Sequence, residues 1–134
     1  MTELDAVLFA NEVFYRAFAD RDMAAMADVW AEEVTLTCIH PGWGLLEGGD
    51  EVLQSWQAIL GNPNSPVVRC QGAKAHMQGD MAYVVCYEEI EGNYLIASNI
   101  FVHEGRRWRL VHHQAGPTAD APSAEAKDEG GLIN

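Results

Sequence analysis

The first 60 residues carry apolar side chains at the spacing of three and four that marks one face of a helix. The first stripe predicts an amphipathic helix over residues 3–19, whose apolar face is interrupted by the hydrogen-bonding residues Asn11 and Tyr15. Two shorter stripes predict a second helix over residues 23–30 and a third over residues 52–60. Three helices are therefore expected in the N-terminal half.

A β-branched segment between the second and third helices, residues 34–39, predicts one strand. Further along, the period changes to two, and four long strands are predicted over residues 67–77, 81–91, 93–103 and 106–115. The turns that separate these four strands are short, which favours consecutive antiparallel hairpins. The expected fold class is α+β, in the order α-α-β-α-β-β-β-β, with a strongly curved antiparallel sheet and the helices packed on one face.

A length of 134 residues is typical of one domain. After residue 116 the composition turns to Ala, Pro, Ser, Asp and Gly, which predicts a domain over residues 1–116 and a disordered tail over residues 117–134. The formal net charge of −12 argues against nucleic acid and anionic membranes as partners. An acidic N-terminus without the signal-peptide pattern, and no apolar run of ~20 residues, predict a cytoplasmic protein.

The cysteine and histidine spacings exclude the common metal motifs. Cys38, Cys70 and Cys86 form no CxxC pair, so we expect reduced thiols in or near the core. The histidines are not spaced as HxH or HExxH, so no metal site is expected. There is no GxGxxG or GxxxxGK[ST] motif either, so no cofactor is expected.

The predicted element order, together with CIHPGWG, LLEG and GDEVLQSW in the first half and ASNIFVHEGRRWRLVHHQAG near the end, resembles the SnoaL-like group of the nuclear transport factor 2-like superfamily. The resemblance covers residues 3–116. It implies a cone-shaped, cystatin-like fold, a pocket between the three helices and the concave face of the sheet, and a homodimer formed through the sheet. Because the superfamily includes ketosteroid isomerases, polyketide cyclases and the association domain of calcium/calmodulin-dependent protein kinase II, the fold implies no single reaction.

The ketosteroid isomerases offer a comparison at individual positions. Their general base precedes a proline at the end of the first strand, and the matching residue looks like His40. Their helix-1 tyrosine falls on Phe14 or Tyr15, depending on a one-residue register. Near the position of their protonated strand carboxylic acid this chain has Ser98 and Asn99, so the isomerase triad is not intact and a steroid isomerase is disfavoured.

Three residues are candidates for catalysis. His40 leaves a strand at a Pro-Gly turn and would act as general base, because imidazole titrates near pH ~6.5. The alternative is a histidine tied to a loop carbonyl that only shapes the turn. Tyr15 and Asn99 would polarise a carbonyl group of the substrate, or would only satisfy other buried polar groups.

The candidates for ligand binding are Asn11, Trp43, Trp56, His112 and His113. Trp43 lies in a glycine-flanked loop and is the best candidate for a lid. Strict alternation along the last strand puts His112 on the inward face and leaves His113 to reach a dimer interface, unless a bulge intervenes. Each histidine has a structural alternative as a hydrogen-bonded core residue.

The remaining charged residues receive mainly structural interpretations. Glu88, Glu89 and Glu91 could form an acid/base set, but their place at a strand end more simply indicates a solvated edge. A deeply placed Arg69 or Arg109 would bind a carboxylate ligand. The residues expected to balance neighbouring acids at the surface or an interface are Arg106, Arg107 and Arg109.

Two functions of different classes remain open. One is a SnoaL-like small-molecule pocket protein that binds a small carbonyl or polyketide-like compound, or performs acid–base isomerase or cyclase-type chemistry on it. The other is a non-catalytic dimerisation or association module resembling the kinase association domain. The expected partners are a small-molecule ligand and a second copy of the chain, with neither nucleic acid nor membrane.

Overall fold

The computed structural model describes residues 1–123. The three helices are α1 (Glu3–Asp20), α2 (Met23–Val29) and α3 (Gly49–Gly61). The strands are β1 (Thr37–Ile39), β2 (Leu46–Glu47), β3 (Arg69–Gln78), β4 (Met81–Ile90), β5 (Asn93–Glu104) and β6 (Arg107–Thr118). Part of the predicted tail therefore belongs to β6, and its last residues, 124–134, lie outside the described residues.

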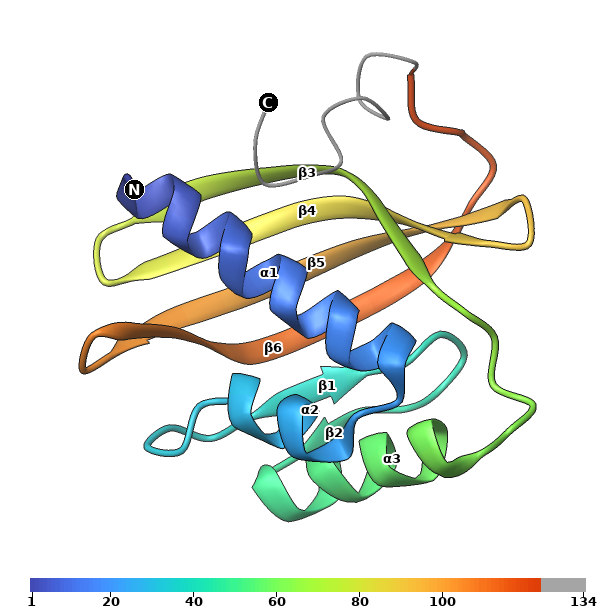
Figure 1. Cartoon of the computed structure of the whole chain (residues 1–134), viewed down its shortest axis with the longest axis horizontal. Helices are drawn as coiled ribbons and strands as arrows, with labels where there is room; N and C mark the ends of the chain where they lie inside the picture. Colours follow the sequence, from blue (N-terminus) through green and yellow to red (C-terminus); the bar gives the residue numbers. More distant parts are fainter. Residues whose placement is uncertain (124–134) are drawn as a thin grey trace.

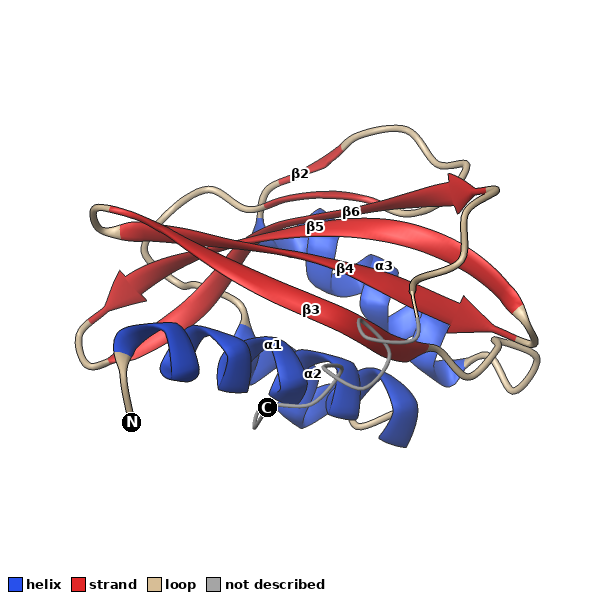
Figure 2. Ribbon diagram, turned by 90° about the horizontal axis from the view of Figure 1, so that it is seen from above, coloured by secondary structure: helices blue, strands red, loops and turns tan. Residues whose placement is uncertain are grey.

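The strands form one six-stranded sheet in the order β2-β1-β6-β5-β4-β3. The sheet curves over α1 and α2, which lie together on one side of it (Figure 2), and α1 crosses the long strands diagonally (Figure 1). The predicted α+β class and curved sheet are confirmed. The antiparallel description needs one correction, because β1 pairs with β6 in parallel and the sheet is therefore mixed. The two-residue β2, which pairs antiparallel with β1, is too short to leave a pattern in the sequence.

Local sequence signals explain where the first two helices begin. The Thr2 side chain accepts the backbone N–H of Asp5, and the Asp5 carboxylate accepts the N–H of Thr2, which is a complete capping box. Asp22 caps α2 by accepting the backbone N–H of Ala25 at 3.0 Å. Between the two helices Arg21 adopts a left-handed conformation with φ of 54°. The Arg21 guanidinium donates to backbone carbonyls of the segment that follows α3, including that of Asn62 at 2.6 Å.

The core lies between α1, α3 and the concave face of the sheet. Phe14 is at its centre and meets Trp56 edge to face, with ring centroids 5.4 Å apart. Trp30 and Phe101 are also almost completely buried. Such contacts favour one fixed arrangement of the aromatic rings over a loosely packed interior. The core therefore holds α1 rigidly beside the strands that carry the candidate site.

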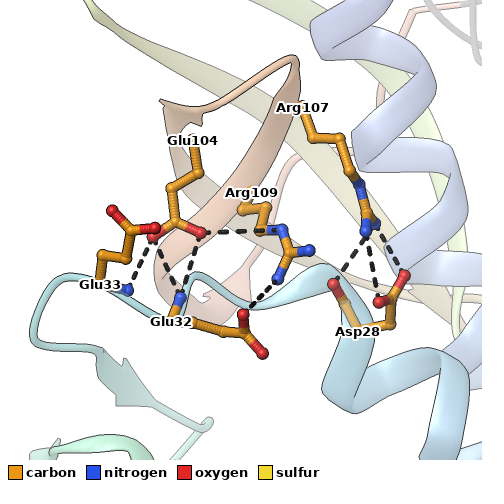
Figure 3. A network of polar contacts seen from close by, with 6 residues as sticks. All are labelled: Asp28, Glu32, Glu33, Glu104, Arg107 and Arg109. Carbon is orange, nitrogen blue, oxygen red and sulfur yellow. Dashed lines mark hydrogen bonds and ion pairs between the residues drawn. The ribbon is translucent and has the colours of Figure 1, made fainter.

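The carboxylate of Glu104 ties the segment after α2 to the β5–β6 hairpin (Figure 3). It accepts hydrogen bonds from the backbone N–H groups of Glu32, at 3.1 Å, and Glu33, at 2.8 Å. Its other oxygen lies 3.7 Å from Nε of Arg109, whose side chain is only 15% exposed. Arg109 is therefore engaged by an acid of its own chain.

The neighbouring Arg107 forms a second link between β6 and α2 (Figure 3). Its guanidinium lies 2.7 Å from the Asp28 carboxylate, and this hydrogen bond holds the pKa of Asp28 below its ordinary value. The expectation that the arginines of the last hairpin balance neighbouring acids is thus confirmed for Arg107 and Arg109.

Replacing Glu104 by glutamine lowers the free energy of unfolding by about 1–2 kcal/mol, because two backbone N–H groups lose a charged acceptor. Urea denaturation measures the change. Glu47→Gln, at an exposed residue of β2, is the matched control and leaves stability within about 0.5 kcal/mol. Equal effects of the two variants would contradict a special role for Glu104.

Candidate functional site

A cavity of about 340 Å³ opens between the end of α1, α3 and the inner face of the sheet. Most of its wall is apolar, and His40, Glu88 and His113 are the ionisable residues among those that line it. The remaining lining residues are Phe18, Pro41, Trp43, Ile59, Ser65, Pro66, Val68, Ile90 and Leu95. An apolar wall with a few convergent polar groups is typical of a small-molecule site.

His40 is held on this wall as an uncharged base. Its Nε2 lies 2.9 Å from Oγ of Ser55, and the Ser55 hydroxyl is 2.6 Å from the backbone carbonyl of Val52. Since that hydroxyl has one proton and donates it to Val52, it accepts from Nε2–H of His40. The Nδ1 atom of His40 is then the unprotonated nitrogen. Burial lowers the pKa of His40 from 6.5 to about 4, so the imidazole stays neutral at physiological pH.

Two tryptophans enclose the His40 ring. Trp56 of α3 is fully buried, and its ring centroid lies 4.8 Å from that of His40. Trp43, in the loop after β1, makes a similar edge contact at 4.8 Å, yet it is 47% exposed. Trp43 thus covers one side of the cavity from a solvent-exposed loop, and its interpretation as a lid stays a prediction.

A chain of hydrogen bonds passes through the core beside the cavity. Nδ1 of His113 lies 2.6 Å from Oδ1 of Asn99. The Asn99 amide nitrogen donates to Oδ1 of Asn11, at 2.9 Å, and to the Tyr15 hydroxyl, at 3.2 Å. The Tyr15 hydroxyl in turn donates to Oε2 of Glu88, at 2.6 Å. Because Oδ1 of Asn99 can only accept, Nδ1 of His113 carries the proton and Nε2 is free to accept.

Glu88 and His113 form the ionisable pair of the wall. Nε2 of His113 lies 3.8 Å from Oε2 of Glu88, and both residues are at most 2% exposed. Burial raises the pKa of Glu88 from 4.5 to about 7 and lowers the pKa of His113 from 6.5 to about 3. Glu88 therefore keeps a proton under conditions in which an exposed glutamate is ionised.

The interpretation of Glu88 as part of a solvated edge is wrong. Alternation along β4 continues inward through Val84 and Cys86 to Glu88, and all of these residues are buried. This unbroken period of two is the sequence signal that could have revealed Glu88. Ser55, which fixes the tautomer of His40, left no comparable signal, because one serine on a helix matches many structural roles.

The expected orientation of the two adjacent histidines is also wrong. In the pairing of β5 with β6, Ile100 faces His112 and the next residue faces Leu110, so Val111 is an extra residue in a β-bulge. The bulge reverses the alternation and turns His113 inward, where it is 1% exposed. His112 is instead half-buried, with Nδ1 2.7 Å from the Thr37 hydroxyl.

The other predicted site residues do not line this cavity. Asn11 and Tyr15 border a separate hollow of about 520 Å³ between α1 and β3. Asn99 is completely buried behind the wall, with its amide engaged by four side chains. The structure thus brings His40, Trp43 and His113 together around one space, and connects Tyr15 to it through Glu88.

The cysteines are free, as expected, and all three contact predicted site residues, Cys70 through a hydrogen bond from Asn11. Sγ of the buried Cys38 lies 3.7 Å from Nε2 of His40. Burial raises the pKa of the Cys38 thiol to about 12. Sγ of Cys86 lies 3.3 Å from the Tyr15 hydroxyl. Residues 1–123 bring no three His, Cys, Asp or Glu side chains together in a way that would hold a metal ion. None of the helices in this part of the chain combines the length and apolarity needed to cross a bilayer.

Comparison with solved structures supports the fold. A candidate dehydratase of the nuclear transport factor 2-like family from Streptomyces avermitilis is 28% identical, with a TM-score of 0.79 that covers 88% of this chain and 97% of that one. A candidate calcium/calmodulin-dependent protein kinase type II association domain from Thiobacillus denitrificans is also 28% identical, with a TM-score of 0.72 over 81% of this chain and 92% of the other.

Sequence comparison gives the family. F-box protein SKIP8 from Arabidopsis thaliana is 30% identical over 112 residues, which are 82% of this chain and 48% of that protein. The chain thus spans about half the length of this curated relative. Residues 7–120 match the SnoaL-like domain, which confirms the resemblance drawn from the residues. With most of its length inside that match, the chain belongs to the SnoaL-like domain family.

Proposed function

We propose that this protein is a small-molecule pocket protein that catalyses proton transfer on a carbonyl compound. The observation that carries the proposal is that His40 and Glu88 line one cavity, where burial lowers the pKa of His40 to about 4 and raises the pKa of Glu88 to about 7. Enolisation of a carbonyl compound requires these two groups, one to remove a carbon-bound proton and one to protonate the oxygen. The proposal is further supported by the Streptomyces avermitilis protein, which is named as a candidate dehydratase.

The proposed reaction moves two protons. Nδ1 of His40 takes a proton from the carbon next to the carbonyl group, and the electron pair shifts onto the carbonyl oxygen. The Glu88–His113 pair gives that oxygen its proton, so an enol forms. In a β,γ-unsaturated ketone, the imidazolium of His40 returns its proton to the γ-carbon while the enol oxygen gives its proton back to Glu88, which yields the conjugated isomer. In an aldol ring closure, the enol carbon attacks a second carbonyl group, whose oxygen takes the proton from His40, and the enol proton again returns to Glu88. Each positioned proton transfer contributes about 10²–10⁴-fold to the rate.

Tyr15 and Asn99 act in this proposal as positioning residues. Tyr15 donates to Glu88 at 2.6 Å and so fixes the carboxyl group beside the cavity. Asn99 accepts Nδ1–H of His113 at 2.6 Å and leaves Nε2 directed toward Glu88. Neither residue lines the cavity, so the direct polarisation of a substrate carbonyl falls to the Glu88–His113 pair.

The test follows proton exchange at the α-carbon of 2-tetralone, a two-ring ketone, in deuterated buffer by NMR. The protein accelerates exchange in a saturable manner, and His40→Gln reduces the saturated rate by at least about 100-fold, because glutamine cannot take up the proton. His76→Gln, at an exposed histidine of β3, is the matched control and leaves the rate unchanged. Full exchange activity in His40→Gln would remove His40 from the mechanism.

A second candidate function is a non-catalytic association module, which the likeness to the Thiobacillus denitrificans domain favours. It would form a homodimer through the outer face of the sheet, where Ile96 of β5 is 47% exposed. Sedimentation at low protein concentration tests this alternative. A stable monomer counts against an association module, whereas a dimer that lacks any exchange activity on 2-tetralone favours it over the enzyme.

A further inference from the structure

The cavity wall lacks a fixed charge. None of its twelve lining residues is lysine or arginine, and its ionisable members are His40, Glu88 and His113. The two arginines that the sequence offers for binding a carboxylate, Arg69 and Arg109, do not line this cavity. Arg109 is paired with Glu104 at the far end of β6, and Arg69 is exposed on β3.

Burial favours the uncharged forms of the ionisable groups of the wall. Nδ1–H of His113 is committed to Asn99, so Nε2 faces Glu88 across 3.8 Å with a lone pair to offer. This distance is too long for a hydrogen bond, and the raised pKa of Glu88 together with the lowered pKa of His113 assigns the proton to Glu88, which leaves both side chains uncharged. His40 donates Nε2–H to Ser55 and keeps its second nitrogen unprotonated. The polar part of the wall therefore offers one donor and one acceptor.

A charged ligand would have no group of opposite charge beside it in this cavity. A carboxylate would lie against Phe18, Ile59 and Leu95 without a cation, and burial of an unpaired ion is strongly unfavourable. The net charge of −12 also repels anions before they reach the cavity. Arg21, which is not among the lining residues, already donates to the backbone carbonyl groups of Leu60, Asn62 and Ser65. An ammonium group would find no anion on the wall while Glu88 holds its proton.

We propose that the cavity selects uncharged carbonyl compounds of about two rings and excludes carboxylates and amines of the same size. This inference rests on the proposed function and restricts its substrate class. A volume of about 340 Å³ accommodates a two-ring molecule, and pockets for small ligands begin near this size. The carbonyl oxygen meets the proton of the Glu88–His113 pair, and the acidic C–H group faces His40.

Three probes of similar size test the selection by isothermal titration calorimetry at pH 6, where Glu88 is protonated. They are 2-tetralone, which is neutral, 2-naphthoate, which is an anion, and 2-naphthylmethylammonium, which is a cation. We expect 2-tetralone to bind at least about 30-fold more tightly than either ion, because only the ions bring an unpaired charge into the cavity.

A cation placed in the wall provides the matched variant. Ile59 is half-buried on α3 and lines the cavity, whereas the adjacent Ala58 is exposed. Ile59→Lys is expected to tighten binding of 2-naphthoate at least about 10-fold, because the buried carboxylate gains a partner. Ala58→Lys adds the same charge outside the cavity and leaves the order of affinities unchanged.

The outcomes separate this inference from the proposed function. If 2-naphthoate or the ammonium probe binds as tightly as 2-tetralone, or Ile59→Lys brings no gain for 2-naphthoate, charge selection is wrong while the pocket stands. If none of the three probes binds to the wild-type protein, the proposed small-molecule function fails together with the selection. A preference for 2-tetralone over 2-naphthoate that becomes smaller in Ile59→Lys and stays unchanged in Ala58→Lys supports both.

Discussion

Replacing Asn99 by leucine lowers the free energy of unfolding by about 3–5 kcal/mol. The substitution keeps the volume of the side chain but removes the amide that joins Asn11, Tyr15 and His113. These partners stay in a region where Asn99 itself is completely buried, and each unsatisfied buried polar group costs about 1–3 kcal/mol. Urea denaturation followed by circular dichroism measures the loss.

Asn93→Leu is the matched control for this prediction. Asn93 lies on the same strand, β5, and is exposed at its first residue, so its replacement changes stability by less than about 0.5 kcal/mol. If Asn99→Leu were equally mild, the hydrogen-bond chain would not organise the core. A loss confined to Asn99→Leu would establish that the polar groups behind the cavity act as one unit.

The stability of the protein falls as the pH decreases from 6.5 to 4.5. Burial lowers the pKa of His40 to about 4 and that of His113 to about 3, so in this interval the unfolded chain binds both protons and the folded chain binds neither. The contribution of these two histidines to the free energy of unfolding is complete above pH 6.5. It is lost as the pH falls, by up to about 3 kcal/mol for each histidine. Urea denaturation across this pH range measures the trend.

Glu88 acts in the opposite direction. Its pKa is raised from 4.5 to about 7. The contribution of Glu88 to the free energy of unfolding is therefore complete below pH 4.5 and is lost as the pH rises through 7. Between pH 4.5 and 6.5 Glu88 offsets one of the two histidines, which leaves a net decrease of about 2–3 kcal/mol. Glu88→Gln removes this offset and makes the decrease about twice as steep, whereas His40→Gln makes it shallower. Parallel curves for wild type and Glu88→Gln would contradict the raised pKa of Glu88.

The sequence was sufficient for the helices and the long strands, because each has a periodic apolar pattern and a cap or turn at its ends. It was insufficient for the edge of the sheet, where Leu46 and Glu47 pair with β1 in a strand of two residues. It also did not reveal that β1 joins β6 in parallel. Pairings between distant segments depend on the packing of the whole chain, and no local pattern records them.

The residues of the candidate site could be predicted where a reactive side chain interrupts the local pattern of apolar and polar positions. His40 stands at a Pro-Gly turn, and the structure places it on the cavity wall. Asn99 and Tyr15 could be predicted as candidates because they are polar residues on apolar faces, and the structure shows a hydrogen bond between them. Glu88 was interpreted as part of a solvated edge because acidic neighbours follow at positions 89 and 91. His113 was a ligand-binding candidate, but its inward orientation could not be predicted because a bulge changes no residue type.

The extra residue at Val111 makes the identity of the inward-facing histidine depend on strand register rather than on side-chain chemistry. Deletion of Val111 would remove the bulge and still leave His112 opposite Ile100 and His113 opposite Asn99. A register shift that pairs Val111 with Ile100 would instead turn His112 inward, and every later residue of β6 would change face with it. Because Ala115 is buried and would then turn outward, the packing of the second half of β6 selects which histidine faces the hollow.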